Sequence, residues 1–236
     1  MILFPLRWVP GRSIHTAWTD DSNPNYPPLI VMLDCSDKRV SQVKSELLQI
    51  LADDEHRRLH QYQRAEDRDR FLLARGCLRL LLGQFLLLPP AKLVIQCDAY
   101  GKPSLGPNES STMNRTLHFN VSHSGELILL GFHGFRCVGV DVELHSVDLD
   151  WYSIAKLCFP QSITSALQKV PSQDQMHRFY QEWCRLEARL KASGLGFSGL
   201  NVLDYASDSS VDADKPCWDI RLPKGYSGAA ALHGCS

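Results

Sequence analysis

Two carboxylates interrupt the apolar stretch at residues 138–143, which otherwise consists of valine and glycine. The stretch has the pattern of a buried strand, in which alternate side chains share a face, so Asp141 and Glu143 point the same way. Two like charges side by side repel each other unless a cation lies between them. The pattern indicates a cation site, and a solvated strand end is the alternative that stays open.

A third carboxylate, Glu187, lies on the inward face of a predicted helix. Apolar residues at helical spacing form one stripe that includes Glu187, and Lys191 follows one turn later. Burying an unpaired charge is costly, so Glu187 needs a partner. An ordinary helix pair with Lys191 would supply one, and so would a divalent cation shared with the two strand carboxylates. The apolar stripe consists of Met176, Phe179, Tyr180, Trp183, Leu186 and Leu190.

The expected cation is Mg2+. Three carboxylates without a neighbouring cysteine or histidine offer oxygen ligands only, which hard cations prefer. The nine histidines show no spacing typical of a zinc site. The eight cysteines include no C-x-x-C pair, which favours reduced thiols and a cytoplasmic protein.

Composition excludes some classes of partner. The chain has 236 residues, 44% of them hydrophobic and 22% charged, with a net charge of −1. It therefore has no overall basic field for nucleic acid or for an anionic membrane, and a local cluster must bind any anionic ligand. The sequence shows neither a signal peptide nor an apolar run long enough to span a bilayer.

The N-terminal part predicts a strand at residues 29–33, helical turns at 40–51 and 55–62 and a long helix at 66–88. Asp53 or Asp54 is the expected N-cap of the second helix. In the long helix, Arg70 lies at the border of the apolar face and needs an anion, either a protein carboxylate or a ligand phosphate. The periodicity puts Arg68, Arg75 and Arg79 on the opposite, solvated face.

A polar stretch at residues 106–116 indicates a division into an N-terminal half, 1–115, and a C-terminal half, 116–236. Strands are predicted at 117–121, 126–132 and 136–143 as an antiparallel meander, and weaker ones at 202–205, 218–222 and 229–233. Helices are expected from 151 to 158 and from an N-cap at Asp174 to Gly194.

Four motifs occur in a fixed order: Gly101-Lys102-Pro103, Asn120-Val-Ser122-His123-Ser124, the strand with Asp141 and Glu143, and Trp183-Cys-Arg-Leu-Glu187-Ala-Arg-Leu-Lys191. The ordered set resembles the 4′-phosphopantetheinyl transferases, and within them the monomeric, surfactin-type subfamily. The resemblance covers most of the chain except about the first fifty and last thirty residues.

The resemblance implies an α/β (α+β) fold of two similar subdomains related by a pseudo-two-fold axis, each a small, mostly antiparallel sheet with a long helix. It also implies a Mg2+-dependent enzyme that moves the phosphopantetheine arm of coenzyme A to a serine of an acyl or peptidyl carrier protein, in fatty-acid, polyketide or nonribosomal-peptide synthesis. The second product would be adenosine 3′,5′-bisphosphate. The serine belongs to the partner, which agrees with the absence of a G-x-S-x-G nucleophile motif.

Residue roles carry over from the family by position. Asp141, Glu143 and Glu187 would hold Mg2+. Glu187 and Lys191 would be catalytic. The residues expected to bind coenzyme A are Arg58 at the 3′-phosphate, Lys102 near the adenine and its phosphates, Ser122 and His123 at phosphates, Lys191 at the pyrophosphate, and Asn120 and Arg70. From the residues alone, His123 could equally cap its turn.

One position departs from the family. Many members have lysine directly before the motif glutamate, and this chain has Leu186 at the edge of the apolar stripe. Glu187 is therefore the better candidate for the general base. Two rival functions stay open, a Mg2+-dependent nucleotide or pyrophosphate hydrolase and a non-catalytic protein that binds coenzyme A. Carrier docking is expected at Arg68, Arg75 and Arg79 or at the loop after Gly194.

Overall fold

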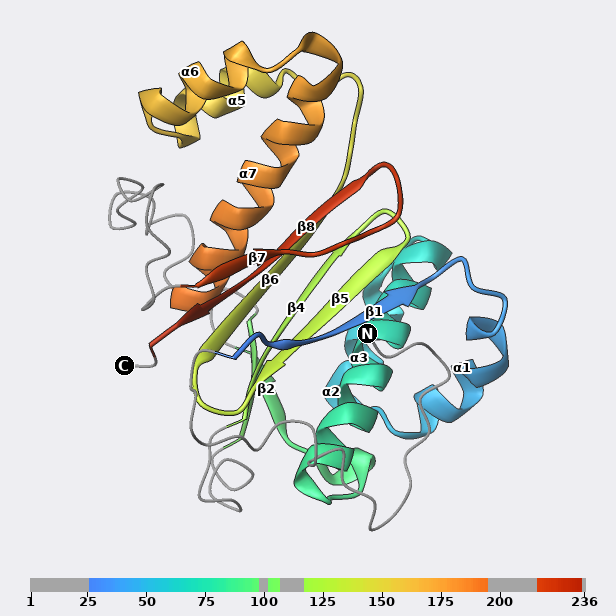
Figure 1. The fold of residues 1–236 in the computed structure, drawn as a ribbon. Coiled ribbons are helices and arrows are strands. Elements are labelled where there is room, and N and C mark those ends of the chain that lie inside the picture. Colours follow the sequence, from blue (N-terminus) through green and yellow to red (C-terminus); the bar gives the residue numbers. More distant parts are fainter. Residues whose placement is uncertain (1–25, 98–101, 107–116, 195–215, 235–236) are drawn as a thin grey trace.

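Two three-stranded antiparallel sheets, each packed against a 22-residue helix, form the framework of the protein (Figure 1). The computed structural model describes residues 26–97, 102–106, 117–194 and 216–234.

The first sheet and its helices come from the N-terminal part of the chain. The sheet has the strand order β1-β5-β4. A separate two-stranded sheet, β2-β3, comes after α3 and before the β4-β5 hairpin in the sequence. The elements are β1 (Leu29–Asp34), α1 (Val40–Gln49), α2 (Asp53–Gln61), α3 (Ala65–Leu86), the 3-10 helix η2 (Pro90–Lys92), β2 (Ile95–Cys97), β3 (Pro103–Leu105), β4 (His118–Ser124) and β5 (Leu127–His133).

The second sheet repeats this arrangement with the strand order β6-β8-β7. Its elements are β6 (Cys137–Leu144), α5 (Trp151–Cys158), α6 (Gln161–Lys169), α7 (Ser172–Ser193), β7 (Cys217–Asp219) and β8 (Tyr226–His233).

Each sheet and its helices follow the same path along the chain. A first strand leads into helices, the last of which is the long one, and a hairpin follows whose second strand pairs with the first strand. The predicted fold class of two similar mostly antiparallel subdomains is confirmed. The chain passes from the first sheet to the second between β5 and β6. The domain boundary predicted after residue 115 stays a prediction.

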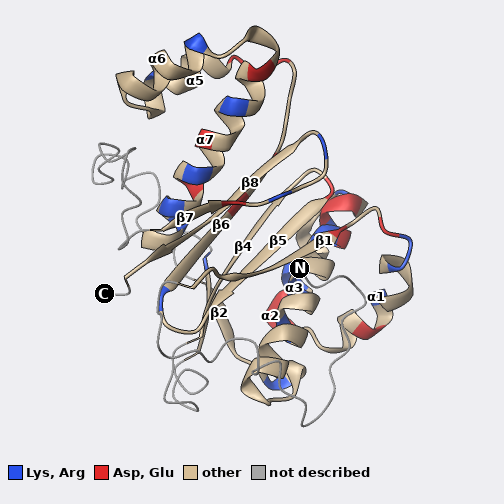
Figure 2. Cartoon of the chain, in the orientation of Figure 1, with Lys and Arg blue, Asp and Glu red and all other residues tan. Residues whose placement is uncertain are grey.

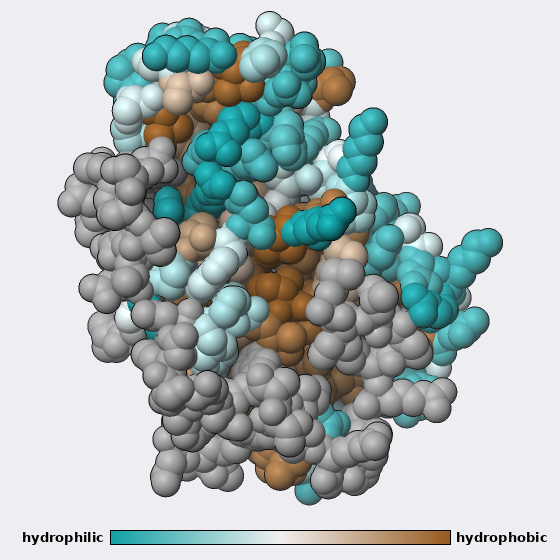
Figure 3. All heavy atoms as spheres, viewed as in Figure 1, coloured by the Kyte–Doolittle hydropathy of each residue, from teal (hydrophilic) through white to brown (hydrophobic). Residues whose placement is uncertain are grey.

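Burial explains how the layers hold together. Leu78 and Leu82 of α3 pack with Phe132 and Ile128 of β5 in one core. A second core joins α7 to α5 and α6, and a third, with Val140 of β6, lies between the two sheets. Figure 3 shows apolar atoms reaching the surface in a strip over the sheets, between α7 and the N-terminal helices.

The predicted meander is wrong at its third strand. β4 and β5 form the expected hairpin, but β6 pairs with β8, which comes from the far end of the chain. Side chains join β4 to β6 instead, because Asn120 Oδ1 accepts a hydrogen bond from Val140 N at 3.0 Å and Ser124 Oγ accepts one from Leu144 N at 3.0 Å. Alternation identifies a strand but not its partner.

Helix ends differ by a few residues from the predictions. α2 begins at Asp53 with Ala52 as N-cap, α3 spans Ala65–Leu86, and α7 begins at Ser172, two residues before Asp174. Gly194 has φ = 74° and ends α7 as predicted. The strand predicted at 202–205 lies outside the described residues.

Two further predictions concern the thiols and the membrane. Cys35, Cys77, Cys97, Cys158, Cys184 and Cys217 are free, as expected. Cys137 is disulfide-bonded, so the prediction of reduced thiols is wrong at this residue, because the absence of a C-x-x-C pair does not exclude a bond between distant cysteines. In the parts of the chain that the structure describes, none of the helices combines the length and the hydropathy that a membrane crossing requires.

Candidate functional site

Asp141 lies at the centre of a polar cluster that joins β4, β6 and α7. Its side chain is 3% exposed. Oδ1 accepts hydrogen bonds from Lys191 Nζ at 2.6 Å and from Ser122 Oγ at 3.0 Å. Oδ2 is buried and makes no hydrogen bond with the described residues.

Glu143 and Glu187 belong to the same electrostatic environment. Burial raises the pKa of Glu143, and the charge of Asp141 raises it further, while a hydrogen bond from Ser124 Oγ to its Oε2 at 2.9 Å opposes this. Burial also raises the pKa of Glu187, and Lys191 opposes the added effect of the two strand carboxylates. The charges of the two strand carboxylates therefore act on Glu187.

A close helix–strand contact brings these side chains together. Gly139 faces α7, and a Cβ added there would lie 2.0 Å from Ala188 O. Small residues of α7 and β8 form the rest of this contact. Since Gly139, Asp141 and Glu143 share one face of β6, the close approach of α7 brings Glu187 and Lys191 to the carboxylates. Figure 2 shows the basic residues along α7 beside the sheet that carries the acids.

The cluster offers the donor atoms that Mg2+ prefers, together with a buried oxygen that lacks a partner. Within the described ranges, however, no group of three or more His, Cys, Asp or Glu side chains is arranged so that it could hold a metal ion. The ammonium group of Lys191 is the cation that contacts Asp141. The chemistry of the residues fits a hard cation, and their roles as ligands remain a prediction.

Lys102 reaches the same cluster from the segment before β3. Its Nζ donates to the backbone oxygen of Lys191 at 2.5 Å. This bond satisfies a carbonyl in the last turn of α7, where a positive charge is favourable. Gly101 of the same motif lies outside the described residues.

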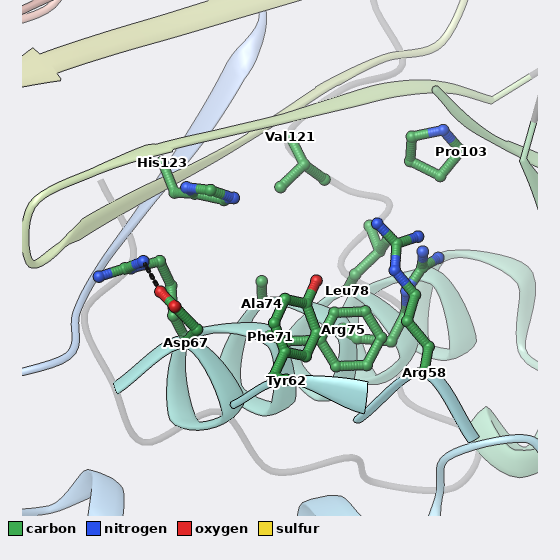
Figure 4. A pocket seen from close by; sticks show the side chains of 11 residues that line it. Arg58, Tyr62, Asp67, Phe71, Ala74, Arg75, Leu78, Pro103, Val121 and His123 are labelled. Atoms are coloured by element: carbon green, nitrogen blue, oxygen red, sulfur yellow. Dashed lines mark hydrogen bonds and ion pairs between the residues drawn. The ribbon is translucent and has the colours of Figure 1, made fainter. Parts of the chain in front are cut away.

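A pocket of about 210 Å3 opens on the other side of β4, above α3. In Figure 4, Arg58 and Arg75 lie together at one end, near Pro103, and Asp67 and His123 lie at the other, with the rings of Tyr62 and Phe71 between them. The lining residues are Arg58, Tyr62, Asp67, Arg70, Phe71, Ala74, Arg75, Leu78, Pro103, Val121 and His123.

Each end of the pocket carries at least one arginine. Arg70 Nη1 lies 2.8 Å from Asp67 Oδ1, so Arg70 has a protein carboxylate, but its Nε is buried and unpaired among the described residues. Arg58 lies over the ring of Phe71, with 5.4 Å from its Cζ to the centroid. Burial lowers the pKa of His123, and the charges of Arg70 and Lys191 lower it further. The predicted residues Arg58, Arg70 and His123 thus line one pocket.

The prediction that Arg75 and Arg79 are solvated is wrong. Their side chains are 10% and 1% exposed, and both form ion pairs with Glu55 of α2. Arg68 is exposed as predicted. The helical wheel located the apolar face of α3 but could not show that α2 covers the opposite side. Arg75, a pocket residue, was therefore missed, because its partner Glu55 lies in a different helix and no periodicity of α3 reveals the pair.

Asn120 and Ser122 face β6 and do not line the pocket. Asn120 is buried and its Oδ1 accepts from Val140 N. Ser122 Oγ lies between Asp141 and Lys191. Because neighbouring side chains of β4 point to opposite faces, Ser122 contacts the carboxylates while His123 faces the pocket. A phosphate contact for Ser122 and a coenzyme A contact for Asn120 remain predictions.

Comparison with known proteins agrees with this geometry. Residues 40–133 match the family described as 4′-phosphopantetheinyl transferase, N-terminal, and residues 137–225 match the 4′-phosphopantetheinyl transferase superfamily. The chain is 31% identical over 216 residues to the 4′-phosphopantetheinyl transferase HetI of Nostoc sp., covering 90% of this chain and 86% of that protein.

Two further relatives have the same kind of name. A putative 4′-phosphopantetheinyl transferase of Synechocystis sp. is 35% identical over 150 residues, covering 64% of this chain and 59% of that protein. The 4′-phosphopantetheinyl transferase Sfp of Bacillus subtilis is 26% identical over 205 residues, covering 82% of this chain and 87% of that protein.

Proposed function

The chain belongs to the 4′-phosphopantetheinyl transferase superfamily. From this premise we propose that it transfers the 4′-phosphopantetheine arm of coenzyme A to a serine of an apo acyl or peptidyl carrier protein. The serine oxygen forms a bond to the phosphorus that carries pantetheine, the bond to the bridging oxygen breaks, and adenosine 3′,5′-bisphosphate leaves. The observation that carries the proposal is the acidic cluster beside a cationic pocket, within residues that match both family halves.

Glu187 acts as the general base in this proposal and receives the proton of the serine hydroxyl. The raised pKa of its carboxyl group supports this role, since a general base works best when its pKa lies near the operating pH. Lys191 and His123 stabilise the charge that develops on the phosphate oxygens. Phosphoryl-type transfer requires mainly such neutralisation and in-line positioning.

Asp141, Glu143 and Glu187 would hold Mg2+. When bound, the ion would neutralise pyrophosphate charge as a Lewis acid. The oxygen-only donor set and the unpaired Oδ2 of Asp141 support this assignment.

The two ends of the pocket suit two charged groups of one ligand. We propose that the 3′-phosphate binds at the end with Arg58, where Arg75 also lies, and that the pyrophosphate binds at the end with Arg70 and His123. The second assignment is supported by Ser122, the chain neighbour of His123, whose Oγ contacts both Asp141 and Lys191. Lys102, beside Lys191, would then lie near the phosphates rather than deep in the pocket.

The partners and setting follow from this chemistry. We propose that the carrier protein and coenzyme A are the two substrates, and that the chain acts as a cytoplasmic monomer without nucleic acid or membrane as a partner. Of the three arginines expected to dock the carrier, Arg75 and Arg79 are buried and Arg68 is exposed, so Arg68 remains a candidate. The other candidate, the loop after Gly194, lies outside the described residues.

Intact-mass measurement tests the function. An apo carrier protein incubated with this chain, coenzyme A and Mg2+ should gain the mass of one phosphopantetheine arm. Consumption of coenzyme A without a carrier would instead favour the hydrolase, and binding of coenzyme A with no mass gain on any of several carriers would favour the non-catalytic protein.

A further inference from the structure

Arg79 is one of the most deeply buried charged side chains of the described residues, at 1% exposure. Its Nε lies 2.6 Å from Glu55 Oε2, and its Nη1 donates to Pro90 O at 2.8 Å and to Leu93 O at 3.0 Å. These bonds fix Arg79 between α2, α3 and the segment that follows α3.

Glu55 is held on one side and offers its other oxygen to a second arginine. Oε2 accepts from Arg79 and from Ala52 N at 2.9 Å, which locks the carboxylate to the start of α2. Oε1 lies 3.5 Å from Arg75 Nε and has no hydrogen bond of its own among the described residues. One carboxylate therefore serves two guanidinium groups, and one positive charge is left over.

Arg75 carries that charge to the pocket. Its Nη2 lies 3.7 Å from Cys97 Sγ, and its Cζ lies 5.9 Å from the centroid of Phe71. Its Nη1 is buried and unpaired within the described part of the chain, and Arg75 lines the same end of the pocket as Arg58. A buried guanidinium nitrogen without a partner requires an acceptor that the described residues do not supply.

We propose that Glu55, locked by Arg79, is a positioning residue that fixes the guanidinium of Arg75 in the pocket for an anionic phosphate group of coenzyme A. The inference rests on the proposed function, because coenzyme A supplies the phosphate. A buried ion pair adds little net stability compared with apolar packing, but it holds a charged group in one orientation. Pre-organisation of this kind improves binding by reducing the cost of ordering the side chain.

A double-mutant cycle tests the inference, with adenosine 3′,5′-bisphosphate as the probe and calorimetry as the measurement. Glu55→Gln should weaken probe binding about 5- to 10-fold when Arg75 is present and less than about twofold in the Arg75→Ala background, because contacting residues give non-additive effects. A purely structural role of Glu55 would give the same loss in both backgrounds, and this result would overturn the inference. Tighter binding by Glu55→Gln would overturn it as well.

Glu182 provides the matched control. It is a buried carboxylate in α7 that also pairs with two arginines, at 2.7 Å from Arg178 and 3.0 Å from Arg185, but it does not line the pocket. Glu182→Gln should lower the urea midpoint and leave probe affinity unchanged. If Glu55→Gln does not fold, Glu55→Asp keeps the charge but withdraws it by one methylene, and it should show the same dependence on Arg75 to a smaller extent.

The outcomes separate the inference from the function on which it rests. If the unaltered chain binds the probe and modifies a carrier but the effects of the Glu55 and Arg75 substitutions are additive, only the positioning role is rejected. An unaltered chain that neither binds the probe nor modifies a carrier rejects the transferase function itself.

Discussion

Lys191 Nζ lies 2.6 Å from Asp141 Oδ1, so the last turn of α7 is joined by an ion pair to the middle of β6. Asp141 is almost fully buried, while the lysine side chain is 30% exposed. The lysine therefore neutralises a charge that the fold has removed from water. Any cation that enters the cluster must share Asp141 with this ammonium group or displace it.

Lys191→Ala should remove this neutralisation. We expect a loss of about 2 kcal/mol in the free energy of unfolding, less than for a fully buried pair because the lysine is partly exposed. Transfer should slow by roughly 100-fold, since a group that stabilises developing charge is lost. Urea unfolding and the carrier assay measure the two effects. The exposed Lys224→Ala is the control, and equal behaviour of the two variants would contradict the prediction.

Glu187→Gln should slow transfer by roughly 100- to 10,000-fold while the protein stays folded. Burial raises the pKa of Glu187, so the ionised carboxylate is less favourable in the folded chain than in the unfolded chain. Near neutral pH its removal should therefore leave the metal-free melting temperature unchanged or higher. A variant that retains its rate of carrier modification would show that another group takes the proton.

Leu186→Ala should act through packing. Leu186 is 0% exposed in the core that joins α7 to α5 and α6. Truncation of a buried leucine costs about 2–5 kcal/mol. Measured well below its melting temperature, the variant should keep the KM for coenzyme A of the unaltered chain. A selective rise in KM at unchanged stability would instead place Leu186 in the binding site.

Gly139→Ala should separate α7 from β6. The added Cβ would lie 2.0 Å from Ala188 O and 2.4 Å from Ala192 N, which are backbone atoms that cannot rotate away. Overpacking costs about 1–3 kcal/mol, and the shift should also lower the transfer rate. Gly234→Ala, with nothing within 4 Å of its added Cβ, is the control. If stability and rate are both retained, the close contact does not position the site.

His133 should make stability depend on pH. Burial lowers the pKa of His133 from 6.5 to about 4, and its Nδ1 accepts from Arg136 N at 2.9 Å and Phe135 N at 3.2 Å. Between these two pKa values the unfolded chain binds the proton more readily, so unfolding becomes easier as pH falls. His133→Asn keeps an acceptor and cannot titrate. Urea unfolding at pH 7 and pH 5 should show a smaller difference for this variant, and an equal difference would reject the assignment.

The sequence predicted the acidic cluster because both parts of it follow from regular periodicity. Alternation in β6 put Asp141 and Glu143 on one face, and the helical wheel turned Glu187 inward. The tight contact at Gly139 could not be predicted, because it depends on how close α7 lies to β6 and not on the pattern of either element. The same applies to the pairing of β6 with β8, which joins distant parts of the chain.

The arginines of α3 show a second limit. A helical wheel assumes one buried face, and it assigned Arg70 correctly to the border of that face. In the structure, α3 is covered on more than one side. The helical wheel therefore wrongly predicted that Arg75 and Arg79, which are buried, face solvent. Their burial depends on ion pairs with Glu55, which lies 20 and 24 residues earlier in the sequence.

Side-chain hydrogen bonds join β4 to β6 along one seam, among them those that Asn120 Oδ1 and Ser124 Oγ accept from main-chain N–H groups of β6, and each sheet keeps its main-chain ladders to itself. A cut in the short turn between β5 and β6, at residues 134–136, would thus leave both sheets whole. Two such fragments, produced as separate polypeptides, should reassociate along the seam, and their recombination would turn this enzyme into a reporter of the proximity of two fused proteins.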